Sequence, residues 1–135
     1  MYYAVFHAVM NAAADQIVGV GADRSAPNLY TLVYRSVDHA SLRGLCQDIT
    51  RSTLAPKYAP FAPAGGFNSN LKSFAAEVAE LQEKRHSCDY DPLFRVTKSG
   101  ATLAISAARA ALNQFDHVPT DEKVVFLSLL LFKAR

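Results

Sequence analysis

The sequence predicts an all-α protein, folded as an up-and-down antiparallel bundle of about five helices. Apolar residues recur at spacings of three and four along several segments of the 135-residue chain, the pattern of helices that bury one face. Glycine and proline clusters separate these segments, and no segment alternates apolar and polar residues as a half-buried strand does. Half of the residues are hydrophobic and 19% are charged, so we expect one globular domain over residues 1–135.

The first predicted helix covers residues 2–18 and begins with the apolar stretch YYAVFHAV. Apolar side chains occupy most of its circumference. His7, Asn11 and Asp15 follow one another at intervals of four and form one narrow polar ribbon. We interpret His7 as a packing or hydrogen-bonding residue, because a lone histidine on an apolar helix is more often bonded within a core than bound to a metal.

Residues 28–50 predict a second helical region, for which two interpretations stay open. One helix can cover the whole region. Alternatively, Ser36 is a fresh N-cap and a new helix starts near residue 37. In both cases the inward face of the second half consists of Leu42, Leu45, Cys46 and Ile49.

Residues 51–67 predict an extended connection, because they contain three prolines and a glycine pair. A third helix is expected from residue 71 to about residue 85. Thr97 or Ser99 is expected to cap a fourth, alanine-rich helix, and Thr120 to cap a fifth. The apolar face of the third helix consists of Leu71, Phe74, Val78 and Leu81.

The composition excludes several classes of function. A formal net charge of +2 is too small to indicate nucleic-acid binding by charge alone. The longest late apolar run is shorter than the roughly 20 residues that span a bilayer, so we expect no membrane association. Cys46 and Cys88 stand in no metal-binding spacing, and no nucleotide-binding or metalloprotease motif occurs. We therefore expect reduced thiols, a cytoplasmic location, and neither a cofactor nor a metal.

Arg35 and His39 are the first candidates for chemistry. On a continuous helix their spacing of four places them on one face, and Arg43 extends the row by the same step. A guanidinium beside an imidazole suits phosphodiester chemistry, because arginine binds phosphate oxygens and histidine moves a proton near neutral pH. The alternative interpretation is a surface arginine beside a half-buried helical histidine.

The segment KRHSCDYDP, residues 84–92, holds the second group of candidates. Asp89 can fix Arg85 or orient a histidine, and Tyr90 can supply a hydroxyl to a buried network. The alternative interpretation is the basic end of a helix followed by an Asp-Pro turn.

Three stretches resemble bacterial HEPN domains. YYAVFHAV at 2–9 resembles the YYAMFHAA-type helix of that family, and EKRHSCDYD at 83–91 resembles the R-x-x-ADY segment after its third core helix. RSVDHASLRGLC at 35–46 stands where the family often has Thr-His before an apolar helix. The resemblance covers about residues 2–115. It implies a short helical bundle, commonly dimeric, of the kind found in toxin–antitoxin, abortive-infection and other defence systems.

Active members of the family are metal-independent ribonucleases with an Arg-x(4–6)-His motif that meets across a dimer interface, and other members are inactive binding modules. Here three residues separate Arg35 from His39, one fewer than that motif requires. The helix that usually precedes the YYAMFHA segment is also lacking, either lost or encoded upstream of a start codon placed late. An apolar first helix without that neighbour predicts a homodimer with residues 1–18 at or near the interface.

Two functional hypotheses follow from the resemblance. In the first, the protein binds or cleaves RNA, with His39 as general base or acid and Arg35 stabilising the developing charge. The supporting residues in this hypothesis are Arg43, Arg85, Asp89 and Tyr90. In the second, it is a non-catalytic module that binds a partner protein, such as a nucleotidyltransferase-like subunit. The incomplete motif and the modest charge favour this second hypothesis.

Overall fold

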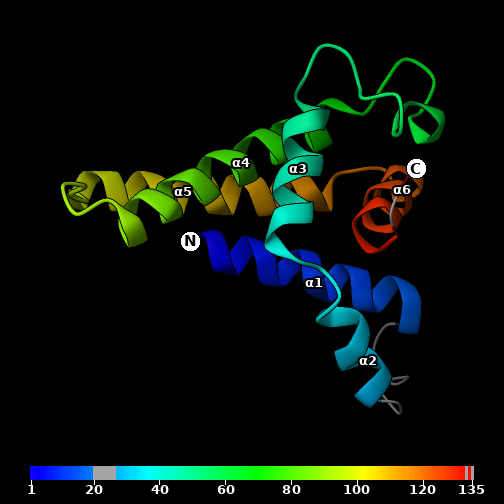
Figure 1. Cartoon of the computed structure of the whole chain (residues 1–135), viewed down its shortest axis with the longest axis horizontal. Helices are drawn as coiled ribbons and strands as arrows, with labels where there is room; N and C mark the ends of the chain where they lie inside the picture. Colours follow the sequence, from blue (N-terminus) through cyan, green and yellow to red (C-terminus); the bar gives the residue numbers. More distant parts are fainter. Residues whose placement is uncertain (20–26, 133, 135) are drawn as a thin grey trace.

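The structure is a computed structural model that describes residues 1–19, 27–132 and 134. Within these residues all regular structure is helical (Figure 1), so the predicted all-α class is confirmed. The described residues form six α-helices in place of about five: α1 (Tyr2–Val18), α2 (Pro27–Tyr34), α3 (His39–Ile49), α4 (Ser69–Tyr90), α5 (Lys98–Asp116) and α6 (Thr120–Leu131). A short 3₁₀-helix covers Ala59–Phe61.

The apolar side of α1 is covered by other helices of the same chain. Residues of α2, α4, α5 and α6 contact it. The buried side chains of α1 are Tyr2, Val5, Phe6, Val9, Met10, Ala13 and Ala14. The homodimer through residues 1–18 stays a prediction. Because α1 is covered within one chain, its apolar surface is no longer a reason to expect a second copy.

The polar ribbon of α1 holds α2 in place. His7 Nδ1 is hydrogen-bonded to Tyr34 Oη. Tyr30 Oη donates to Asp15 Oδ1 at 3.2 Å and to Asn11 Oδ1 at 3.3 Å. The prediction that His7 is a packing or hydrogen-bonding residue is therefore confirmed, and the ribbon pairs with two tyrosines of α2.

The region 28–50 is divided, as the second interpretation proposed, but the cap is a different residue. Asp38 is the N-cap of α3, and its carboxylate accepts from Ser41 N and Ser41 Oγ, each at 2.7 Å. Ser36 does not cap α3, because its hydroxyl donates back to Leu32 O at 2.7 Å, at the end of α2. Aspartate is among the best N-caps, since its carboxylate accepts from free backbone N–H groups and interacts favourably with the helix dipole.

Helices α4 and α5 form a long antiparallel hairpin, which extends away from the other helices in Figure 1. Helix α4 runs past its predicted end near residue 85 to Tyr90. It ends there because Pro92, two residues on, has no backbone N–H and disfavours a helical residue before it. Helix α5 then begins after Thr97, whose Oγ1 accepts from Gly100 N at 2.9 Å.

The predicted cap of α6 is wrong. Thr120 is the first residue of α6, and the N-cap is Pro119, which makes no side-chain capping bond. The carboxylate of Glu122 in the first turn instead accepts from Asn68 N at 2.7 Å. This bond joins the start of α6 to the start of α4, and Glu122 is only 6% exposed.

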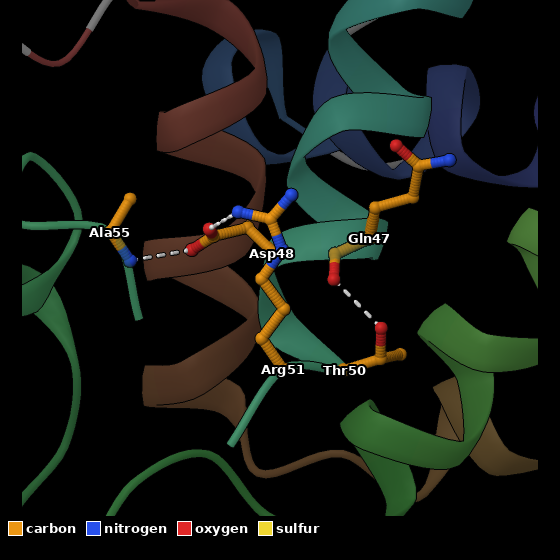
Figure 2. Close-up of polar contacts among 5 residues, drawn as sticks. All are labelled: Gln47, Asp48, Thr50, Arg51 and Ala55. Atoms are coloured by element: carbon orange, nitrogen blue, oxygen red, sulfur yellow. Dashed lines mark hydrogen bonds and ion pairs between the residues drawn. The ribbon is translucent and has the colours of Figure 1, made fainter. Parts of the chain in front are cut away.

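The segment 51–67 is a series of turns with one 3₁₀-helix, and not the extended connection that the prolines predicted. A buried carboxylate attaches its first part to the end of α3 (Figure 2). Asp48, 4% exposed, accepts from Ala55 N at 3.1 Å and from Arg51 Nη1 at 3.4 Å. The hydrogen bond from the Ala55 N–H therefore holds the start of this segment against α3.

The core contains both apolar faces predicted from spacing. All four residues of each face are buried. Where α4, α5 and α6 meet, the Phe74 ring lies 4.7 Å from Phe115 and 6.0 Å from Phe126, between ring centroids. These distances are typical of favourable tilted and edge-to-face aromatic pairs.

Candidate functional site

His39, the first residue of α3, lies against the N-terminal end of α1. Its Nδ1 is 2.7 Å from Tyr2 Oη, and its ring stacks on Phe6 with 3.9 Å between centroids. The Tyr3 ring lies nearly perpendicular to the imidazole, with 5.9 Å between centroids. Gln82 of α4 donates from Nε2 to the His39 carbonyl at 3.1 Å. Side chains of α1 therefore hold the imidazole, and Gln82 of α4 holds the backbone of His39.

Arg85 of α4 lies beside the same cluster. Its Nη2 donates to Tyr3 Oη at 2.6 Å, and the guanidinium carbon is 5.0 Å from the centre of the Tyr3 ring. Arg85 Nε lies 3.2 Å from Asp89 Oδ2, an ion pair without hydrogen-bond alignment. The spacing of Arg85 and Asp89 places them one turn apart on α4, which continues past its predicted end near residue 85. This ion pair is partly exposed, with 29% and 46% of the two side chains accessible.

Burial and the nearby Arg85 cation favour the neutral imidazole near pH 7. Burial lowers the pKa of His39 below its usual 6.5, the nearby Arg85 cation lowers it further, and Asp38 opposes the shift. Burial raises the pKa of Tyr2 to about 12, although Arg85 opposes that shift. Tyr2 therefore keeps its hydroxyl proton, and His39 is available at neutral pH as a group that accepts a proton.

We expect the lowered pKa of His39 to make the fold less stable in mild acid. The folded state prefers neutral His39, so its contribution to the free energy of unfolding is complete above the unfolded pKa of about 6.5. It is lost as the pH falls from there through the lower folded-state pKa. Urea unfolding of the wild type and of His39→Gln between pH 7.5 and about pH 5 tests this. The wild type should lose more stability over this range than the variant, and equal losses would contradict the assignment.

A groove of about 250 Å³ runs beside the cluster, between the start of α1 and the facing sides of α4 and α5. Tyr2, Tyr3, Lys84 and Arg85 contribute to its wall. The rest of the wall is mainly apolar and includes Met1, Leu81, Cys88, Val96, Ala101 and Ala104. Tyr3 is 46% exposed, so its ring and the guanidinium beside it are open to a ligand.

The other predicted site residues do not join this cluster. Arg35 is exposed in the turn after α2, where the break before α3 removes the helical spacing that would have paired it with His39. Arg43 is exposed one turn further along α3. In the described part of the chain, no hydrogen bond or ion pair joins either arginine to His39. Tyr90 is 67% exposed and packs on His86, with 4.7 Å between ring centroids.

Of the two roles expected for Asp89, the structure shows the one beside Arg85. Three partners of His39 were not predicted. Tyr2, Tyr3 and Phe6 were assigned only to the apolar helix. The one signal for them was the paired tyrosine in YYAVFHAV, since buried hydroxyls need a partner.

Two further properties bear on chemistry and location. Among the described residues, no three or more histidine, cysteine or acidic side chains are grouped so as to hold a metal ion. None of the helices formed by those residues has both the length and the apolar character to cross a membrane.

Comparison of the chain with family models, curated proteins and solved structures finds no match.

Proposed function

We propose that the protein is a HEPN-like helical protein that binds RNA and cleaves it without a metal ion, in a toxin–antitoxin or other defence context. The observation that carries the proposal is the cluster of a neutral imidazole, a guanidinium and two tyrosines. The guanidinium and both tyrosines also line one groove. The family resemblance of the segments at 2–9 and 83–91 supports it, because these two segments supply Tyr2, Tyr3 and Arg85.

In this proposal His39 is the general base that takes the proton of a ribose 2′-hydroxyl. The tautomer in which Nδ1–H donates to Tyr2 Oη leaves Nε2 unprotonated for that role. Attack of the 2′-oxygen on the adjacent phosphorus would break the bond to the 5′-oxygen and leave a cyclic phosphate. Arg85 then replaces Arg35 as the cation that stabilises the charge developing on the phosphate oxygens.

The pairing of Arg85 with Asp89 does not prevent this. Partly exposed ion pairs stabilise a protein by only about 0–1 kcal/mol. A phosphate can accept two parallel hydrogen bonds from the guanidinium. The exposed Tyr3 ring is a surface on which a base can stack, a contact worth about 1–3 kcal/mol per base. Asp89 holds Arg85 in position until a phosphate binds.

The test is cleavage of a single-stranded RNA in the presence of a metal chelator. We expect His39→Ala and Arg85→Ala each to lose about 100-fold or more in rate. Arg35→Ala is the matched control, since it removes an exposed arginine outside the groove, and its rate should stay near that of the wild type. Equal background from the wild type and His39→Ala would end the enzyme proposal. A loss confined to Arg35→Ala would show that Arg85 is not the catalytic cation.

The second candidate is a non-catalytic module that binds a partner protein. One observation favours it: both cations beside the groove are already paired, Arg85 with Asp89 and Lys84 with Glu80 at 3.0 Å. In that case RNA is not cleaved by any of the variants, and a stoichiometric partner co-purifies with the wild type from its native host.

A further inference from the structure

Two neighbouring grooves lie where α6 packs beside α3 and the segment 57–61. The first, of about 390 Å³, lies between α3, the residues 57–58 and the end of α6. The second, of about 350 Å³, lies between α6 and the 3₁₀-helix. Because both are lined by the same residues at the end of α6, we treat them as one site. We call it the α6 groove: Gly44, Lys57, Tyr58, Phe61, Leu129 and Phe132. Each part has the size of a small-molecule site.

Gly44 keeps the first part of the α6 groove open. It lies in the interior of α3, where glycine is the least favourable residue after proline. Its backbone does not require glycine, since its φ angle is not positive. Packing does not require it either, because a Cβ at this position would have no other part of the protein within 4 Å. The residue therefore weakens the helix, and what it provides in return is open volume beside Lys57 and Tyr58.

The first part of the groove also holds a cation and a hydroxyl. Lys57 Nζ lies 4.9 Å from the centre of the Tyr58 ring. Within the described part of the chain, this ammonium forms no ion pair and the Tyr58 hydroxyl forms no hydrogen bond. Asp38 caps the same helix, but Ser41 N and Oγ already bind its carboxylate. An ammonium and a phenol are donors suited to a carboxylate, and a single cation balances a ligand with one negative charge.

The second part of the groove is apolar. Of the residues that line it, Ser128 is the one with a polar side chain. The rings of Phe61 and Phe132 stand in it at 50% and 63% exposure. From Val124 to its last residue α6 rises about 10 Å, roughly the length of an extended chain of eight to ten carbons. An unbranched alkyl chain along this helix would remove both rings from water, which is favourable.

We propose that the α6 groove binds a free medium-chain fatty acid. Lys57 and Tyr58 donate to its carboxylate, its first carbons lie beside Gly44, and the rest of its chain follows α6 past Phe61. An amphipathic molecule matches both parts of the groove, whereas a nucleotide carries more charge than one lysine balances. The α6 groove shares no residue with the groove beside Arg85. This inference is therefore independent of the proposed RNA chemistry.

The experiment is isothermal titration calorimetry of the wild type with the sodium salts of hexanoic, octanoic and decanoic acid. We expect one site, with an affinity that rises up to about fourfold for each added CH₂ group that is buried. Decanol has the same chain without the charge and should bind at least about tenfold more weakly than decanoate. A wild type that binds none of the acids overturns the proposal, and so does one that binds decanol as tightly as decanoate.

Gly44→Leu tests the open volume. The leucine fills the groove and should weaken decanoate binding at least about tenfold. Thermal unfolding should occur no earlier than in the wild type, because leucine is the better helix former and meets no other part of the protein. The matched control is Gln47→Leu, the same side chain at an exposed position of α3 that lines neither part of the groove. It should bind decanoate as the wild type does.

Lys57→Gln tests the charge without filling the groove. It should reduce decanoate affinity to about that of decanol and leave decanol binding unchanged. Undiminished decanoate binding by Gly44→Leu or by Lys57→Gln overturns the proposal, as does an equal loss in Gly44→Leu and Gln47→Leu. Since the measured quantity is binding of an alkyl carboxylate, these results do not depend on whether RNA is cleaved.

Discussion

Replacing Phe74 with alanine is expected to lower the free energy of unfolding by about 3–5 kcal/mol. Phe74 is fully buried, and its ring contacts those of Phe115 and Phe126 where α4, α5 and α6 meet. The substitution removes the transfer free energy of the ring and leaves a cavity that three helices can close only in part. Urea unfolding followed by far-ultraviolet circular dichroism measures the change.

The matched control is Phe61→Ala, the same change at a 50% exposed phenylalanine of the 3₁₀-helix. It should cost less than about 1 kcal/mol. If the two variants lose equal stability, then the junction of α4, α5 and α6 is not the main core of the protein.

Residue spacing was sufficient to predict the core-facing sides of α3 and α4. The faces of α3 and α4 are buried residue for residue as predicted, because a helix that buries one side must repeat apolar residues every three or four positions. Helix spacing did not predict the ion pair of Arg85 and Asp89, because the third helix was expected to end near residue 85 and continues to Tyr90. Inferences that stay within one helix depend only on helix geometry, which the sequence specifies locally.

The expectation that Arg35 and His39 share one helical face depended on a continuous helix. Asp38 starts a new helix between them. Ser36 and Asp38 are both good caps by residue type. Which of the two residues caps α3 depends on the position of Val37 between them. Val37 is buried, at 4% exposure, and tertiary packing determines its position. The contact of Tyr2 with His39 joins residues 37 apart, so no local pattern could predict it.

The way in which α1 is covered illustrates the same limit. The apolar circumference of α1 did indicate a helix that must be covered, and it is covered. What the sequence could not show is that the helices of one chain are enough to do this, with α2 held by the polar ribbon. Some of the apolar side chains that stay exposed lie at the end of the hairpin, where Leu93 and Val96 stand in a short loop with no helical periodicity to mark them.

Replacing Tyr2 with alanine is expected to cost about 3–5 kcal/mol of stability. The Tyr2 side chain is 2% exposed, and its ring lies within 6 Å of Phe6 and His39, at 5.9 and 5.4 Å between centroids. Its loss would open a cavity between α1 and α3. Urea unfolding gives the size of the change, and a cost below about 1 kcal/mol would contradict the burial of this ring.

Tyr2→Phe separates the role of the ring from that of the hydroxyl. The ring stays in place, so we expect a loss of only about 1 kcal/mol from the missing hydrogen bond. His39 Nδ1 loses the partner that lies 2.7 Å away, and nitrogen-15 chemical shifts of the imidazole should show a changed balance of tautomers. If His39 is the general base, RNA cleavage should fall about 10- to 100-fold in a protein that remains folded. Unchanged tautomers and unchanged cleavage would mean that the Tyr2 hydroxyl does not orient His39 and that the tyrosine serves the core alone.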